Sequence, residues 1–160
     1  MVTPSLLEAI KVAKDNERIA SESYRSAIDE IQHTVGKRLF QELSDFEQFH
    51  YEKLTELENS LIKEGKYINY QGKEFPIPPI FEVRGAVEPG KKSLMTIITQ
   101  AIGLEETAKK TYADLADEID DALGKEMFKK LSAEEYSHYR ILIEAYWTVS
   151  NFGVWKWVRP

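Results

Sequence analysis

The sequence repeats itself at an offset of 88 residues without a gap, and this repeat constrains the fold more than any other feature. Short identical segments recur in step in the two halves: Asp29-Glu30-Ile31 and Asp117-Glu118-Ile119, Gly36-Lys37 and Gly124-Lys125, Leu43-Ser44 and Leu131-Ser132. Each half should therefore form the same structural unit. We expect the two units to pack about a pseudo-twofold axis.

Apolar residues at alternating spacings of 3 and 4 predict two helices in each half. We expect these helices at residues 5–32, 35–64, 93–119 and 123–150. The segment 65–92 between the halves is rich in proline, which lacks the amide donor that a helix needs. The predicted fold is an all-α four-helix bundle of two repeated antiparallel helix pairs, a single domain over residues 1–160. The long crossover should pack along the bundle surface; a lid or a partner-binding strip is the alternative.

Six ionisable residues interrupt the apolar stripes at matched positions of the two halves. Each half has one Glu on its first helix and a Glu-x-x-His motif on its second helix. A spacing of three residues places the Glu and the His on one helix face. The residues predicted to point into one core are Glu17, Glu47, His50, Glu105, Glu135 and His138.

Four buried carboxylates need a positive partner. Their desolvation costs several kcal/mol per ion, in a fold whose whole stability is about 5–15 kcal/mol. The stripes carry no Lys or Arg near these positions, and two imidazoles could neutralise at most two charges. Two divalent cations balance four carboxylates, and this ligand pattern is typical of two-metal bundles. Mixed oxygen and imidazole ligation favours iron, so we predict two iron ions, with manganese or zinc as substitutes.

The positions of other polar residues, in the core or at the surface, follow less directly from the sequence. Tyr24 and Tyr112 lie seven residues after their Glu on the same stripes, and are either core aromatics or hydrogen-bond donors to the carboxylates. His33 has no histidine at its repeat position and is interpreted as a surface residue. Acidic residues that fall off the stripes are predicted to be solvated: Glu22, Glu30, Glu52, Glu106 and Glu134.

Composition narrows the function classes. The chain has no cysteine, which excludes intramolecular disulfides and thiolate metal sites. A net charge of -6 without a basic face argues against nucleic-acid binding. No apolar run approaches the roughly 20 residues that span a bilayer, and the N-terminus lacks signal-peptide features. We therefore expect no membrane association and a cytoplasmic location.

Several segments resemble the rubrerythrin family of the ferritin-like superfamily, and the resemblance extends over nearly the whole chain. They are residues 17–24 and 39–50 in the first half and 105–112 and 128–138 in the second. The resemblance implies a carboxylate-bridged di-iron centre with Glu47 and Glu135 as bridges and the other four residues as terminal ligands. It also suggests an oxidoreductase that reduces hydrogen peroxide or dioxygen, with Tyr24 and Tyr112 orienting carboxylates or donating protons.

The chain departs from that family in two ways. Rubrerythrins with peroxidase activity carry an extra Glu three residues after the third-helix ligand, where this chain has Ala108. A rubredoxin-like domain is excluded because there is no cysteine to bind its iron. Electrons would therefore come from a separate rubredoxin-like donor. We expect the protein to be a homodimer.

Two other function classes stay open. A ferroxidase of the bacterioferritin type uses a similar ligand set, although Gln48 replaces a haem-ligating Met and the crossover suits a cage poorly. A metal-dependent structural or partner-binding bundle is the third class. Its supporting feature is an aromatic C-terminus, which could cover a bundle end, bury a dimer contact or dock a partner: Trp147, Phe152, Trp155 and Trp157.

Overall fold

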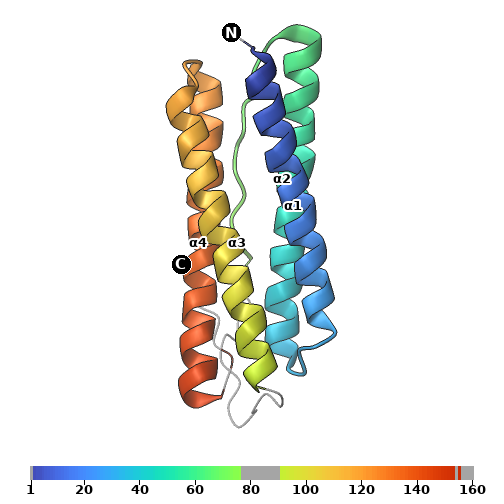
Figure 1. The fold of residues 1–160 in the computed structure, drawn as a ribbon, viewed down its shortest axis with the longest axis vertical. Helices are drawn as coiled ribbons and strands as arrows, with labels where there is room; N and C mark the ends of the chain where they lie inside the picture. The colour runs from blue at the N-terminus through green and yellow to red at the C-terminus, as the bar shows by residue number, and fades with distance from the viewer. Residues whose placement is uncertain (1, 77–90, 154, 156–160) are drawn as a thin grey trace.

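The computed structural model describes residues 2–76, 91–153 and 155, and shows a bundle of four long helices (Figure 1). The helices are α1 (Pro4–Ile28), α2 (Thr34–Glu64), α3 (Lys91–Glu118) and α4 (Ala122–Phe152). The α1 helix packs along α2 and α3 packs along α4, while α1 and α3 touch more sparsely. The predicted all-α bundle of two helix pairs is confirmed. The first helix ends at Ile28, earlier than predicted, where amides turn back to carbonyls three residues away.

Different residue types cap the starts of α2 and α4 at matching repeat positions. The Nδ1 atom of His33 accepts a hydrogen bond of 3.1 Å from the Val35 amide and caps α2. At the repeat position, the Asp121 carboxylate caps α4 by accepting from the Gly124 amide at 3.0 Å. His33 is partly exposed, and its capping role was not predicted from the sequence: an N-cap needs only a well-placed acceptor, which an imidazole can supply.

The described part of the crossover, residues 65–76, runs as an extended segment between the two helix pairs (Figure 1). Tyr70 and Phe75 of this segment are buried, with 3% and 8% exposure. The ring of Phe75 stacks on Phe46 of α2 at 5.9 Å between centroids, and Tyr70 lies 6.2 Å from Phe49. The prediction that the crossover packs on the bundle is confirmed for this part. Residues 77–90 lie outside the described residues.

One aromatic residue covers the start of each second helix. Trp155 lies against Gly36 of α2, and Tyr67 lies against Gly124 of α4. A Cβ atom on either glycine would overlap the facing ring. Tyr67 and Trp155 are themselves separated by the repeat offset, so the repeat extends beyond the helices.

The aromatic residues near the C-terminus differ in burial. Trp155 is buried against the bundle end with 2% exposure, which matches the packing interpretation. Trp147 and Phe152 are exposed at 58% and 67%. Trp157 lies outside the described residues.

The described apolar core falls into two clusters. Phe40, Leu43 and Ile98 belong to one cluster, and Ile10, Leu54 and Phe128 to the other. Buried Glu and His residues on the same helix faces account for the break in the apolar core. None of the described helices is long and apolar enough to cross a lipid bilayer.

Candidate metal centre

The structure brings all six predicted ligand residues together. None of their side chains is more than 3% exposed. Their ligand atoms form two overlapping groups, each within 4.8 Å, that could hold metal ions: Glu17, Glu47, His50 and Glu135; and Glu47, Glu105, Glu135 and His138. We call these groups site A and site B.

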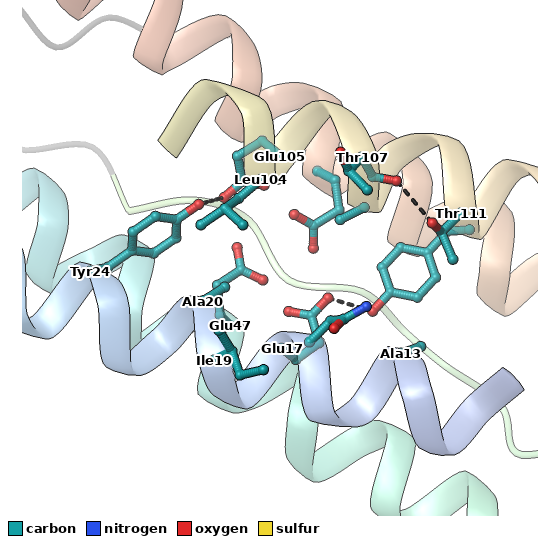
Figure 2. Close-up of a pocket in the computed structure, with 14 residues that line it drawn as sticks. Ala13, Glu17, Ile19, Ala20, Tyr24, Glu47, Leu104, Glu105, Thr107 and Thr111 are labelled. Atoms are coloured by element: carbon teal, nitrogen blue, oxygen red, sulfur yellow. Dashed lines mark hydrogen bonds between the residues drawn. The ribbon is translucent and has the colours of Figure 1, made fainter. Parts of the chain in front are cut away.

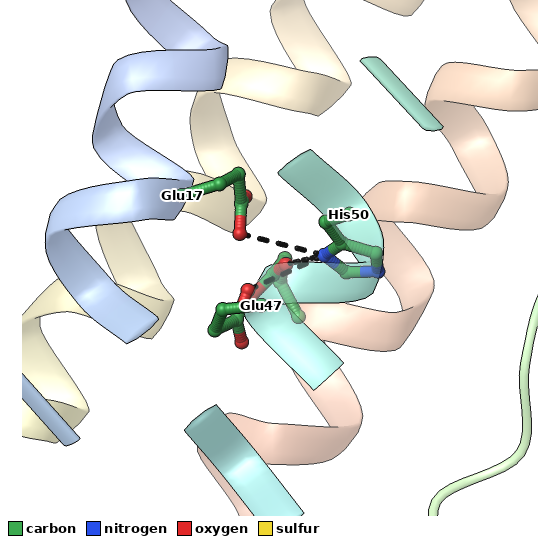
Figure 3. Close-up of side chains that lie close together, drawn as sticks. Glu17, Glu47 and His50 are labelled. Atoms are coloured by element: carbon green, nitrogen blue, oxygen red, sulfur yellow. Dashed lines mark ion pairs between the residues drawn. The ribbon is translucent and has the colours of Figure 1, made fainter. Parts of the chain in front are cut away.

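In site A, Nδ1 of His50 faces three carboxylates. It lies 2.6 Å from Oε1 of Glu135, 3.3 Å from Oε2 of Glu47 and 3.6 Å from Oε2 of Glu17. Figure 3 shows Glu17 of α1 pointing toward the Glu47 and His50 pair of α2. The helix spacing of three residues therefore does place Glu and His side by side.

Site B repeats this arrangement in the second half. Nδ1 of His138 lies 2.9 Å from Oε1 of Glu47, 3.4 Å from Oε2 of Glu105 and 3.6 Å from Oε2 of Glu135. Glu47 and Glu135 belong to both sites. They occupy the places that ligands shared between two ions would take.

Several atoms of this cluster have no hydrogen-bond partner among the described residues. They are Glu17 Oε2, Glu105 Oε2, Glu135 Oε1, both ring nitrogens of His50, and His138 Nε2. No Lys or Arg in the described part of the chain forms an ion pair with the four glutamates. An unsatisfied buried polar group costs about 1–3 kcal/mol, more if charged. Carboxylate oxygens and imidazole nitrogens that converge without partners fit metal ions as their missing partners.

The charges of the cluster perturb one another strongly. Burial, with the nearby Glu105 and Glu17, raises the pKa of Glu135 to about 8. Burial and Glu47 likewise raise the pKa of Glu17. Burial also opposes the charge of Glu105, but the charge of His138 and the hydrogen bonds from Glu135, His138 and Tyr24 together outweigh it and lower this pKa to about 2. In the metal-free protein, bound protons therefore neutralise part of the carboxylate charge, which metal ions would balance when bound.

For the two histidines, the effect of the nearby carboxylates on the pKa outweighs the effect of burial. Burial alone would lower the pKa of His50 and His138, yet both values lie well above the ordinary range. Glu135 supplies the main opposing charge for His50, and Glu105 does so for His138. Both imidazoles are therefore set to carry a proton when no metal is bound.

Two tyrosines connect α1 and α3 through the cluster, and Figure 2 shows the hydroxyl of one of them, Tyr24, next to Glu105. The Tyr24 hydroxyl of α1 donates to Oε1 of Glu105 on α3 at 2.8 Å. In the mirrored direction, Tyr112 of α3 donates to Oε1 of Glu17 on α1. Both rings are 1% exposed. Of the two interpretations of these tyrosines, hydrogen bonding to the carboxylates is the one observed; a role in a reaction stays a prediction.

Sequence reasoning missed two residues of this region, Glu134 of α4 and Tyr70 of the crossover. Glu134 was predicted to be solvated, but its side chain is 12% exposed and its Oε1 lies 3.5 Å from Nε2 of His50. It accepts a hydrogen bond from the hydroxyl of Tyr70 in the crossover, at 2.5 Å. The other four acids of that prediction are exposed: Glu22, Glu30, Glu52 and Glu106. Adjacency to Glu135 was the only sequence signal for Glu134.

A cavity of about 180 Å³ opens between α1 and α3 and reaches the carboxylates (Figure 2). Ile19 and Ala20 line it from α1, and Leu104 and Ala108 line it from α3. Ala20 and Ala108 stand at matching repeat positions. Small side chains at these two places leave a path from the surface to the cluster.

Comparisons with known proteins bear on the fold. No protein-family model and no curated protein matches the sequence. A hypothetical protein from Pyrococcus furiosus shares the fold with a TM-score of 0.72 and 23% identity, over 92% of this chain and 91% of that chain. A two-domain protein from Anabaena variabilis, with DJ-1/ThiJ/PfpI-like and ferritin-like domains, matches with a TM-score of 0.65 and 20% identity. That match covers 92% of this chain and 37% of the other. The chain therefore has the fold of a ferritin-like four-helix bundle, with buried Glu and His groups that could bind metal ions.

Proposed function

We propose that this chain is a rubrerythrin-like di-iron oxidoreductase that reduces hydrogen peroxide or dioxygen. The observation that carries the proposal is the pair of overlapping, fully buried ligand groups that share Glu47 and Glu135. Two divalent ions would offset the charge of four carboxylates, and oxygen with imidazole ligation favours iron. Glu17 and His50 would complete one ion's ligands, and Glu105 and His138 the other's.

The size and lining of the cavity between α1 and α3 favour a small, uncharged substrate. Apart from the site's own glutamates and tyrosines, its lining is uncharged: Ala13, Asn16, Ile19, Ala20, Leu104, Thr107, Ala108 and Thr111. The carboxylates that it reaches repel anions. Its volume of about 180 Å³ exceeds what a diatomic molecule or hydrogen peroxide needs. Both proposed oxidants therefore match the cavity in size and charge.

The proposed reaction needs electrons and protons at the cluster. When bound, the iron pair supplies two electrons, and reduction of hydrogen peroxide to two water molecules takes up two electrons and two protons. The hydroxyls of Tyr24 and Tyr112 hold protons at Glu105 and Glu17, facing the cavity. The chain has no cysteine for a rubredoxin-type centre, so we infer that a separate donor protein returns the electrons.

Anaerobic iron loading followed by stopped-flow mixing tests this function. We expect two ferrous ions per chain, and oxidation by hydrogen peroxide far faster than that of free ferrous ion in the same buffer. Oxidation no faster than in buffer would refute the peroxidase activity. The same experiment with dioxygen tests the second oxidant.

Two neighbouring glutamates provide a matched control. Glu105 is buried in site B, whereas the next residue, Glu106, is exposed on the same helix turn. Glu105→Gln should lower the bound iron and the oxidation rate, and Glu106→Gln should leave both unchanged. Equal effects of the two substitutions would contradict the assignment of the ligands.

A further inference from the structure

The outer nitrogen of His50 faces a hydrogen-bonded pair that is not part of the ligand set. Nδ1 of His50 points to the carboxylates of site A, and Nε2 points away from them, toward Oε1 of Glu134 at 3.5 Å. Both oxygens of Glu134 lie within hydrogen-bond distance of the Tyr70 hydroxyl, at 2.5 and 3.0 Å. Tyr70, Glu134 and His50 thus form a line from the crossover to the metal centre.

The crossover is anchored where it supplies this tyrosine. The backbone carbonyl of Tyr70 accepts a hydrogen bond of 3.1 Å from Nζ of Lys130, one turn before Glu134 on α4. The Tyr70 ring also lies against Phe49 of α2. Contacts with α2 and α4 therefore fix the hydroxyl in front of Glu134.

The second histidine has different surroundings. The repeat position of Glu134 is Phe46, an apolar residue. The rings of Phe46 and Phe75 pack against His138, at 4.4 and 5.2 Å between centroids. Neither Nε2 atom has a hydrogen bond within the described residues, but the Glu134 carboxylate lies 3.5 Å from that of His50, whereas the ion pairs of His138 in the described part of the chain all involve Nδ1. The two halves, symmetric in their six ligands, differ at the far side of the imidazoles.

We propose that Glu134 and Tyr70 are positioning residues that make site A the tighter of the two metal sites, so that the first divalent ion enters beside His50. This inference rests on the proposed metal centre. A carboxylate facing Nε2 keeps the proton on that nitrogen, which leaves the Nδ1 lone pair free for an ion. The same carboxylate makes the imidazole a more basic ligand and adds negative charge near site A. His138 lacks this support among the described residues.

Anaerobic titration of the metal-free protein with Mn²⁺ tests the order of filling, because electron paramagnetic resonance distinguishes free from bound Mn²⁺. We expect two unequal affinities in the wild-type protein. Glu134→Leu should weaken the tighter site about 10–100-fold and leave the weaker site nearly unchanged. Glu134→Gln, which keeps an acceptor oxygen, should retain part of the affinity, and Tyr70→Phe should give a smaller loss. Glu106→Gln is the control for a lost surface charge.

A second readout separates positioning from a general loss of structure. With one equivalent of Co²⁺, the proton NMR spectrum of the wild-type protein should show a shifted, slowly exchanging N–H signal from the ligand histidine. In Glu134→Leu this proton should exchange rapidly with solvent. Equal wild-type affinities, or a tighter site that Glu134→Leu leaves unchanged, would overturn the inference while the metal centre stands. Failure of the wild-type protein to bind Mn²⁺ or Co²⁺ would instead overturn the proposed metal centre itself.

Discussion

The hydroxyl of Tyr24 on α1 lies 2.8 Å from Oε1 of Glu105 on α3, and this hydrogen bond joins the two helix pairs through the buried cluster. Tyr24→Phe should lower the free energy of unfolding of the metal-free protein by about 1–3 kcal/mol, because a buried carboxylate loses its donor. Tyr136→Phe is the control: its ring is 44% exposed, and we expect a change within about 0.5 kcal/mol. Urea denaturation at fixed pH measures both. Equal stabilities of the two variants would contradict the prediction.

Metal-free protein should lose stability as the pH rises from about 5 to 8. Glu135 has its pKa raised from 4.5 to about 8 in the fold, so its bound proton stabilises the folded state fully below pH 4.5. That contribution disappears as the pH passes 8. The raised pKa values of the two histidines act in the same direction. The lowered pKa of Glu105, about 2, matters only in stronger acid, where its contribution is lost.

The expected loss is at least about 1.4 kcal/mol, the value of one pKa unit. Urea denaturation in a chelating buffer at several pH values measures it. Metal-loaded protein should show the opposite slope, because ions bind deprotonated ligands and their stabilising effect grows with pH. A metal-free protein whose stability is the same at pH 5 and pH 8 would refute the predicted repulsion.

Glu135→Gln should separate stability from metal binding. The amide carries no charge, so the metal-free variant should be more stable than the wild type at pH 8. Its stability should fall less between pH 5 and pH 8 than that of the wild type, with the remaining fall due to Glu17 and the two histidines. Glu135 belongs to both sites, so the variant should bind less metal at each. Melting temperatures with and without Fe²⁺ measure the two effects. If the metal-free variant is less stable than the metal-free wild type at pH 8, the charge of Glu135 does not destabilise the fold.

The repeat explains why so much could be predicted from the sequence. One offset fixed the helix pairs and the matched places of the six cluster residues, since periodicity reports which helix face is buried. The features that it missed arise where the halves differ. Glu134 faces His50, while its repeat position is Phe46, and His33 caps a helix where the repeat has Asp121. Tyr70 lies in an irregular segment, whose path depends on tertiary contacts that no spacing rule describes.

The glycines at the starts of α2 and α4 should be needed for packing. Gly124→Ala would place a methyl group against the ring of Tyr67, and we expect a loss of about 1–3 kcal/mol from overpacking. Gly103 of α3 has nothing within 4 Å of its missing Cβ, so Gly103→Ala should raise stability by about 0.5–1 kcal/mol. In a Tyr67→Ala background, Gly124→Ala should cost clearly less, because only the close approach of 2.9 Å to Cγ2 of Ile119 is left. Thermal unfolding of the four variants gives the comparison, and a Gly124→Ala penalty that is undiminished without Tyr67 would place its cause elsewhere.

The cavity between α1 and α3 should act as the path to the cluster. Ala108 lines it and is a metal ligand in neither site, so Ala108→Leu adds bulk in the path without removing a ligand atom. We expect unchanged iron content and an oxidation rate lowered about tenfold or more for hydrogen peroxide, a loss of about 1.4 kcal/mol in transition-state stabilisation. Ala113→Leu, on α3 but outside this cavity, is the matched control and should react like the wild type. If Ala108→Leu binds both ions and reacts at the wild-type rate, the oxidant reaches the cluster by another route.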